Sequence, residues 1–395
     1  MKYAIVLPDG AADEALPQLG GRTPLEAARI PNMDWVAENG RLGRAVTIPE
    51  GFTPGTDVGT LSVLGYDPHR YYSGRAPIEA AAKGLAVRPD QMIFRCNFVT
   101  VLDGKMKDNT AGHISQEEAD ALVADLNAAL GGEGCEFHTG VTYRNLMLLS
   151  GAGSLSLRCA PPHDILGREV AAHAPEGEGA ARVARITGAA AALVADHPVN
   201  RRRRERGKDP VTGIWLWGQG RPVPFESLAS RYGPSGAVIT GVDILRGMAR
   251  LMGMRLLEVP GATGYIDTNY AEKGEAAVRA LEELDLVVVH VEAADEAAHM
   301  GSAEEKIRAL ERIDEAIVGP LLDKLRGFPA WRILVAADHP TPCTTRGHSA
   351  EPPPFAFAGS GVARGGGARF TEAEAARTGF RVDPGWALME SFVRG

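Results

Sequence analysis

The chain has 395 residues and a formal net charge of −8, with 42 Lys and Arg residues against 50 Asp and Glu residues. A hydrophobic content of 45% and a charged content of 23% are typical of globular proteins, and the length allows two or three domains. The acidic balance excludes an extended nucleic-acid surface, because such a surface needs a basic face. No apolar run approaches the roughly 18 residues of a membrane span and no signal-peptide pattern opens the chain, so we expect a cytoplasmic protein without a membrane partner.

The first segment predicts a buried strand that delivers a carboxylate. Tyr3 to Leu7 form a short apolar run, and Asp9-Gly10 follow it with a turn. A helical pattern covers Ile30 to Asn39, and Val58 to Leu64 is suited to begin another helix after the Pro54-Gly55 turn and Thr56.

The pattern changes between residues 87 and 175. An apolar stretch over Met92 to Val101 ends in an Asp103-Gly104 turn, which indicates a hairpin. A helical pattern over Gln116 to Leu130 precedes two strand-like stretches, Thr142 to Leu149 and Ser154 to Arg158. We therefore predict a small α+β domain at 87–175, inserted in a core domain formed by 1–86 and 176–395.

After about residue 210, short apolar stretches alternate with helical patterns. Strands are predicted at 237–240, 255–259, 284–291 and 331–336, and helices at 242–252, 271–282 and 303–325. Strands separated by helices of this length predict an α/β fold with a doubly wound, mostly parallel sheet. Ligands bind such sheets at the carboxyl ends of the strands.

One basic run, Arg201 to Arg204, follows a predicted helix over Ala180 to Ala195. Like charges in series repel each other and favour water, so we expect a solvated loop. The alternative is an entrance that attracts a phosphorylated substrate.

Metal-ligating side chains follow three of the predicted strands: Asp9, the pair Asp295 and His299, and Asp338-His339, with His348 nine residues beyond His339. A spacing of four places Asp295 and His299 on one helix face. Each residue alone has a plainer role, as a helix cap or an exposed helix face. Their shared position at one sheet edge favours a metal centre. Carboxylate and imidazole ligands suit Mn²⁺, Zn²⁺, Co²⁺ or Mg²⁺ better than Ca²⁺.

Thr56 is a candidate nucleophile. A hydroxyl at a helix N-terminus lies where backbone N–H groups attract phosphate oxygens, although a helix cap is an equal alternative. A metal ion would activate the hydroxyl, which is a poor nucleophile by itself.

Longer motifs surround these residues: Pro8-Asp9-Gly10, Pro54-Gly-Thr-Asp-Val58, Leu64-Gly-Tyr-Asp-Pro68, Gly261-Ala-Thr-Gly264, Asp267-Thr268 and Gly347-His348. With them the sequence closely resembles, almost end to end, the archaeal-type cofactor-independent (2,3-bisphosphoglycerate-independent) phosphoglycerate mutases of the alkaline phosphatase superfamily. The resemblance implies an alkaline phosphatase-like core, an inserted domain that covers the substrate, and no bisphosphoglycerate cofactor. It also implies two divalent metal ions, with Mn²⁺ as the first choice and Mg²⁺, Co²⁺ or Zn²⁺ as alternatives.

The resemblance also divides the ligands. One ion would be held by Asp9, Thr56, Asp338 and His339, and the other by Asp295, His299 and His348. Lys273 matches a lysine that lies beside the metals in the family, so Thr56 and Lys273 are the implied catalytic residues.

Three positions depart from the family pattern. Its usual serine nucleophile is Thr56 here, and its Asp-Arg-Arg-Ala-Gly-Arg segment is Asp108-Asn-Thr-Ala-Gly-His113, without arginine forks to grip an anion. Glu292 stands where typical mutases have lysine, as in a bacterial branch proposed to act as homoserine kinases. We predict a substrate site from Arg95, His113, Arg144 and Glu292, in which Glu292 binds an ammonium group or forms an internal ion pair.

The main hypothesis is metal-dependent phosphoryl transfer through phospho-Thr56 that interconverts 2-phosphoglycerate and 3-phosphoglycerate. The substrate partner is then a small phosphorylated metabolite. The alternative is an ATP-dependent homoserine kinase on the same scaffold, followed by a phosphatase with water as acceptor and a non-catalytic metal-binding protein. The sequence leaves the oligomeric state open.

Overall fold

A computed structural model describes residues 1–132 and 134–395. The chain forms two compact units. The core unit comprises Met1–Tyr72 and Pro224–Gly395, and the inserted unit comprises Ser73–Val223. Every helix in the described residues is too short or too polar to cross a lipid bilayer.

The core unit is built on an eight-stranded sheet with the strand order β11-β10-β12-β1-β13-β14-β2-β15. The strands are β1 (Lys2–Pro8), β2 (Arg41–Ala45), β10 (Gly236–Ile239), β11 (Arg255–Leu256), β12 (Leu286–Val291), β13 (Trp331–Ala336), β14 (Pro354–Gly359) and β15 (Arg381–Val382). All neighbours are parallel except β14, which is antiparallel to β13 and β2. The predicted α/β class with a mostly parallel sheet is confirmed.

The centre of this sheet is formed by β1 between β12 and β13. Their side chains are almost all apolar and buried, as expected for parallel strands covered on both faces. Pro8 lies opposite Val291, and Val6 lies opposite Val335. The carboxyl ends of the three strands therefore meet at one point of the sheet edge.

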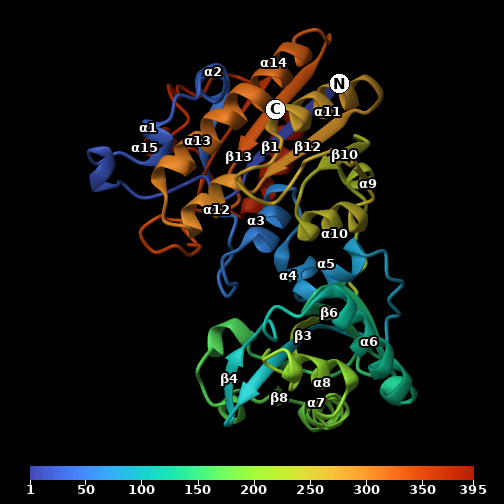
Figure 1. Cartoon of the computed structure of the whole chain (residues 1–395). Helices are drawn as coiled ribbons and strands as arrows, with labels where there is room; N and C mark the ends of the chain where they lie inside the picture. The colour runs from blue at the N-terminus through green and yellow to red at the C-terminus, as the bar shows by residue number, and fades with distance from the viewer. The chain divides into compact units, whose positions relative to one another are not determined.

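Helices cover both faces of the sheet (Figure 1). On one face Val6, Val289 and Val335 belong to a core that is completed by α2 (Pro31–Asn39), α11 (Tyr270–Glu283), α13 (Ala303–Ile313) and α14 (Gly319–Leu325). On the other face α16 (Leu388–Arg394) places Phe392 against Tyr3, with the ring centroids 5.6 Å apart. This arrangement is the doubly wound one that the alternating sequence pattern predicts.

The inserted unit is an α+β unit with an antiparallel sheet. Its long strand β3 (Met92–Leu102) pairs with β4 (Lys105–Asp108), β6 (Arg144–Leu149) and β9 (Gly213–Gly220), and β6 pairs also with β5 (Cys135–Val141). The helices α6 (Gln116–Leu130) and α7 (Ala180–Ala195) pack on one face of this sheet.

The structure places the boundaries of this unit at Ser73 and Val223, outside the expected 87–175. Compared with the expected range, the unit also includes α5 (Arg75–Ala82) on the N-terminal side, and α7, α8 (Pro198–Glu205) and β9 on the C-terminal side. The reason is long-range pairing, because β9 runs along β3 from Gly213 opposite Val99 to Gly220 opposite Ile93. Periodicity along the chain does not reveal such a partner.

The expectation of a solvated loop at Arg201 to Arg204 is wrong, because these residues lie in α8. Arg203 is fully buried, and its guanidinium donates to Glu118 Oε2, to Ala111 O at 2.5 Å and to Asp209 O at 2.9 Å. Glu118 in turn belongs to the capping box that begins α6. Arg203, in the middle of the basic run, thus links three segments of the unit through hydrogen bonds.

We predict that Arg203→Ala lowers the free energy of unfolding of the inserted unit by about 3 kcal/mol, since it leaves buried acceptors unpaired. The matched control is Arg202→Ala in the same helix, where the side chain is exposed, with an expected effect within about 0.5 kcal/mol. Urea unfolding followed by tryptophan fluorescence measures both. Equal stability of the two variants would contradict the assigned role of Arg203.

Candidate metal and phosphoryl-transfer site

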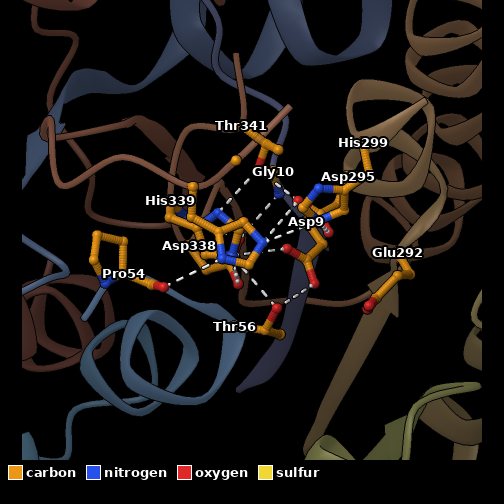
Figure 2. A network of polar contacts seen from close by, with 12 residues as sticks. Asp9, Gly10, Pro54, Thr56, Glu292, Asp295, His299, Asp338, His339 and Thr341 are labelled. Atoms are coloured by element: carbon orange, nitrogen blue, oxygen red, sulfur yellow. Dashed lines mark hydrogen bonds and ion pairs between the residues drawn. The ribbon is translucent and has the colours of Figure 1, made fainter. Parts of the chain in front are cut away.

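Three strand ends bring the predicted metal-ligating residues together. Asp9 follows β1, Asp338-His339 follow β13, and Asp295 lies on α12 (Ala293–His299), directly after β12. Figure 2 shows these side chains converging, with Thr56 beside Asp9. Their common position results from the neighbouring places of the three strands in the sheet.

Thr56 is the first residue of α3 (Thr56–Val63), as the Pro54-Gly55 turn indicates. The helix packs closely on Asp338 at Gly59. A Cβ atom at this position would lie only 2.4 Å from the Asp338 carbonyl oxygen, so a side chain would not fit. This contact brings Thr56 Oγ1 to 3.1 Å from Asp9 Oδ2 and 3.4 Å from His339 Nε2. The hydroxyl therefore lies at the edge of a group of buried ligands.

The first group consists of Asp9, Asp338 and His339, whose ligand atoms lie within 4.8 Å of one another. Asp338 Oδ1 accepts hydrogen bonds from the backbone N–H groups of Gly10 and His339. Within the described part of the chain, Asp9 Oδ1 is buried without a hydrogen-bond donor. Burial, together with the charges of nearby carboxylates, raises the pKa of Asp9 well above its usual range. A divalent cation fits this group, because it would satisfy the oxygen and offset the repulsion.

The second group consists of Asp295, His299 and His348. His299 Nε2 lies 3.0 Å from Asp295 Oδ2 and 3.1 Å from His348 Nε2. Each imidazole is oriented by its other nitrogen: His299 Nδ1 donates to Arg346 O at 2.9 Å, and His348 Nδ1 donates to Pro54 O at 3.2 Å. Both Nε2 atoms are thereby aimed at one point, which is the arrangement that imidazole ligands of a metal ion adopt.

His290 on β12 is a site residue that the sequence analysis missed. Its Nε2–H donates to Asp9 Oδ2 at 2.8 Å, while its Nδ1 lies 3.3 Å from the Thr240 hydroxyl. Burial lowers the pKa of His290 to about 3, with the charge of Lys273 adding to the shift, so the ring is neutral. A single histidine in the otherwise apolar run Leu286–Val291 was the available signal.

Lys273 and Glu292 lie close to the first group. Lys273 is fully buried and donates to His290 O at 3.2 Å, and burial lowers its pKa to about 8, against the opposing charge of Glu292. Burial also raises the pKa of Glu292 to about 7. Glu292 Oε2 lies 3.7 Å from His290 Nε2 and has no hydrogen-bond donor among the described residues. The structure thus places Glu292 with the buried charges around Asp9.

Arg95, Arg144 and His113 belong to the inserted unit. The Arg95 guanidinium lies 4.1 Å from the Trp217 ring centroid, and its Nε lies 3.1 Å from Glu79 Oε2. Burial lowers the pKa of Arg95, and the charges of Arg75 and Arg144 add to this effect against that of Glu79. An anionic ligand beside Arg95 would offset the charges of Arg75 and Arg144 that act on it.

The segment Asp108-Asn-Thr-Ala-Gly-His113 forms a tight turn. The Asp108 carboxylate accepts from the backbone N–H groups of Thr110 and Gly112 and from the Thr110 hydroxyl. Asn97 Nδ2 donates to Asn109 O at 3.3 Å, which ties the turn to β3. His113 is exposed and follows the turn with a φ of 50°. Asp108 and Thr110 therefore stabilise the backbone of the turn.

Over 396 aligned residues and the whole length of both proteins, the chain is 48% identical to the 2,3-bisphosphoglycerate-independent phosphoglycerate mutase of Methanothrix thermoacetophila. The chain belongs to this family. The family model described as 2,3-bisphosphoglycerate-independent phosphoglycerate mutase matches residues 37–200. The resemblance inferred from the motifs is thus confirmed.

Two solved structures are similar to this mutase-family chain over its whole length. A protein of Pyrococcus horikoshii aligns with a TM-score of 0.83 and 29% identity, over 96% of its own chain. The cofactor-independent phosphoglycerate mutase of Thermoplasma acidophilum aligns with a TM-score of 0.69 and 29% identity, over 99% of its chain.

We predict that Gly10→Ala weakens the binding of Mn²⁺ by the metal-stripped protein at least about tenfold. Gly10 has a φ of +60°, and a Cβ atom there would lie 2.5 Å from Asp295 Oδ1 and 2.7 Å from Thr341 Oγ1. The matched control is Gly20→Ala, which has a φ of +67° and no atom within 4 Å of the added Cβ. It carries the same backbone strain but should bind Mn²⁺ as the unaltered protein does. Equal affinities for Gly10→Ala and Gly20→Ala in a calorimetric titration would refute the prediction.

Proposed function

We propose that this protein interconverts 2-phosphoglycerate and 3-phosphoglycerate without bisphosphoglycerate, by way of phospho-Thr56. The observation that carries the proposal is the position of the Thr56 hydroxyl. It begins α3 and lies within 3.4 Å of both Asp9 and His339, beside a group of buried ligands. Membership of the mutase family supports the substrate class.

In this proposal two divalent ions occupy the two groups. Asp9, Thr56, Asp338 and His339 would hold one ion, and Asp295, His299 and His348 would hold the other. Mn²⁺ is the first choice for such mixed carboxylate and imidazole ligands, ahead of Mg²⁺, Co²⁺ and Zn²⁺. When bound, the ions lower the pKa of a coordinated hydroxyl and stabilise the charge of the transferring phosphoryl group.

The chain supplies the nucleophile. Thr56 Oγ1 forms a bond to phosphorus as the bond between phosphorus and the glycerate oxygen breaks. The Thr56 hydroxyl gives up its proton through its hydrogen bond to Asp9 Oδ2, and the glycerate oxygen takes up one proton. Glycerate then reorients, and its other hydroxyl recovers the phosphoryl group by the reverse of these events. Bonds and protons balance over the cycle.

Lys273 adds a positive charge to the same region. Its ammonium lies in a buried position, so its field acts on the reacting groups with little screening by water. Lys273 would stabilise negative charge during transfer of the phosphoryl group. Glu292, which acts on the same lysine, would hold the ammonium in place and thereby contribute to substrate binding indirectly.

The proposal also gives the inserted unit the role of covering the substrate. Arg95 and Arg144 would bind the carboxylate or phosphate group, because their charges exceed that of Glu79. His113 would add a hydrogen bond. These residues would replace the arginines that the Asp108 to His113 segment lacks. Nothing in the comparisons favours the homoserine kinase alternative.

We predict that Thr56→Ala lowers the rate of conversion of 3-phosphoglycerate to 2-phosphoglycerate at least about a thousandfold, because no covalent intermediate can form. Thr56→Ser should retain activity and a phosphorylated residue. The matched control is Thr53→Ala, an exposed residue of the same loop, which should act as the unaltered protein does.

The assay uses Mn²⁺-loaded protein and compares 3-phosphoglycerate alone with homoserine plus ATP. Conversion to 2-phosphoglycerate without added bisphosphoglycerate supports the mutase. Phosphohomoserine formation, release of inorganic phosphate alone, or full activity of Thr56→Ala would each reject it.

A further inference from the structure

We propose that Thr341 couples the two metal groups, because its hydroxyl fixes the tautomer of His339 in one group and orients Asp295 in the other. The inference rests on the proposed function, since it concerns the metal ligands of that site. Thr341 is not a ligand in the division given above. Its role would be that of a positioning residue.

The geometry places one hydroxyl between two ligands that belong to different groups. Thr341 is fully buried, and its Oγ1 lies 2.5 Å from Asp295 Oδ1 and 3.2 Å from His339 Nδ1. Figure 2 shows the threonine beside both side chains. Asp295 and His339 come from α12 and from the loop after β13, so no local sequence feature would hold them together.

The hydrogen atoms in this series of hydrogen bonds, from His339 through Thr341 to Asp295, can be assigned by elimination. An ionised carboxylate only accepts hydrogen bonds, so the single Thr341 hydroxyl hydrogen points to Asp295 Oδ1. The hydroxyl oxygen must then accept the hydrogen that lies between it and the ring, which is carried by His339 Nδ1. A neutral imidazole has one such hydrogen, and His339 Nε2 is left with a free lone pair. That lone pair faces Asp9 Oδ1 at 3.3 Å and Thr56 Oγ1 at 3.4 Å.

The threonine is itself held firmly by its backbone. Its N–H donates to Ala12 O at 3.1 Å, and its carbonyl oxygen accepts from Lys306 Nζ at 2.8 Å. Lys306 is fully buried and also pairs with Asp13 at 2.8 Å. The loop after β1 and the loop after β13 are thus tied to the same lysine. The hydroxyl consequently has a fixed position relative to both metal groups.

Loss of the hydroxyl would affect both groups at once. His339 could then carry its hydrogen on Nε2, the nitrogen that faces Asp9 and Thr56, and that tautomer cannot bind a metal ion through Nε2. Asp295 Oδ1 would at the same time lose the donor that orients it. Loss of a residue that oriented only one group would weaken the binding of only one ion.

The test compares three variants of the full-length, metal-stripped protein by calorimetric titration with Mn²⁺. Thr341→Val removes the hydroxyl at nearly constant volume, and we expect both Mn²⁺ ions to bind about 10- to 100-fold more weakly. Thr341→Ser restores the hydroxyl and should bind both ions within about threefold of the unaltered protein. The matched control is Thr344→Val, an exposed hydroxyl in the same loop, for which no change is expected.

Three results would overturn the inference: unchanged binding by Thr341→Val, weakening of one ion only, or a Thr341→Ser protein as weak as Thr341→Val. Thermal unfolding of the metal-free variants shows whether each is folded. If Thr341→Val is not, Thr341→Ala against Thr341→Ser decides the same question. The unaltered protein separates the two proposals, since two bound Mn²⁺ ions without mutase activity would reject the proposed function alone, and fewer than two bound ions would reject both.

Discussion

The two metal-ligating groups of the core unit depend on where three parallel strands end. β1 lies between β12 and β13, so Asp9, Asp295 and Asp338 are forced into one buried region at the edge of the sheet. Several carboxylates cannot share a low-dielectric region as anions unless cations accompany them. The raised pKa of Asp9 expresses this constraint, as does its Oδ1 atom, which has no hydrogen-bond donor among the described residues. The same repulsion that would destabilise the core without cations makes the site suited to divalent metals.

Close backbone contact makes this convergence possible. Gly10 lets the loop after β1 pass against Asp295 and Thr341, and Gly59 lets α3 rest on the Asp338 carbonyl. Polar neighbours then orient each ligand: Arg346 O and Pro54 O orient two histidines, and His290 orients Asp9. Metal ligands depend on such supporting hydrogen bonds for their geometry. The position of Thr56 is thus a consequence of packing that involves residues far along the chain.

In the proposed function, the inserted unit would apply the same principle to an anionic substrate. Arg95 would be central there, because the charges of Arg75 and Arg144 act on it against that of Glu79. The segment from Asp108 to His113 carries no arginine, and its aspartate stabilises a turn. Arg203 supports that turn from within the unit through Ala111 O. In the proposed function, substrate recognition and stability would therefore depend on different arginines.

The sequence by itself determined the α/β class, the helix over Gln116 to Leu130, a helix after the Pro54-Gly55 turn and three strand ends that carry carboxylate or imidazole side chains. These features depend on periodicity and on residues close in the chain, which a sequence displays directly. Only the tertiary structure revealed His290 against Asp9, Thr341 against Asp295, the buried Arg203 and the boundary of the inserted unit at Ser73 and Val223. Each of these depends on a contact between segments that are far apart in the chain, such as the 281 positions between Asp9 and His290. The hydrogen bonds and burial that define such contacts arise only when the chain is folded, so they cannot be predicted from residue type and spacing.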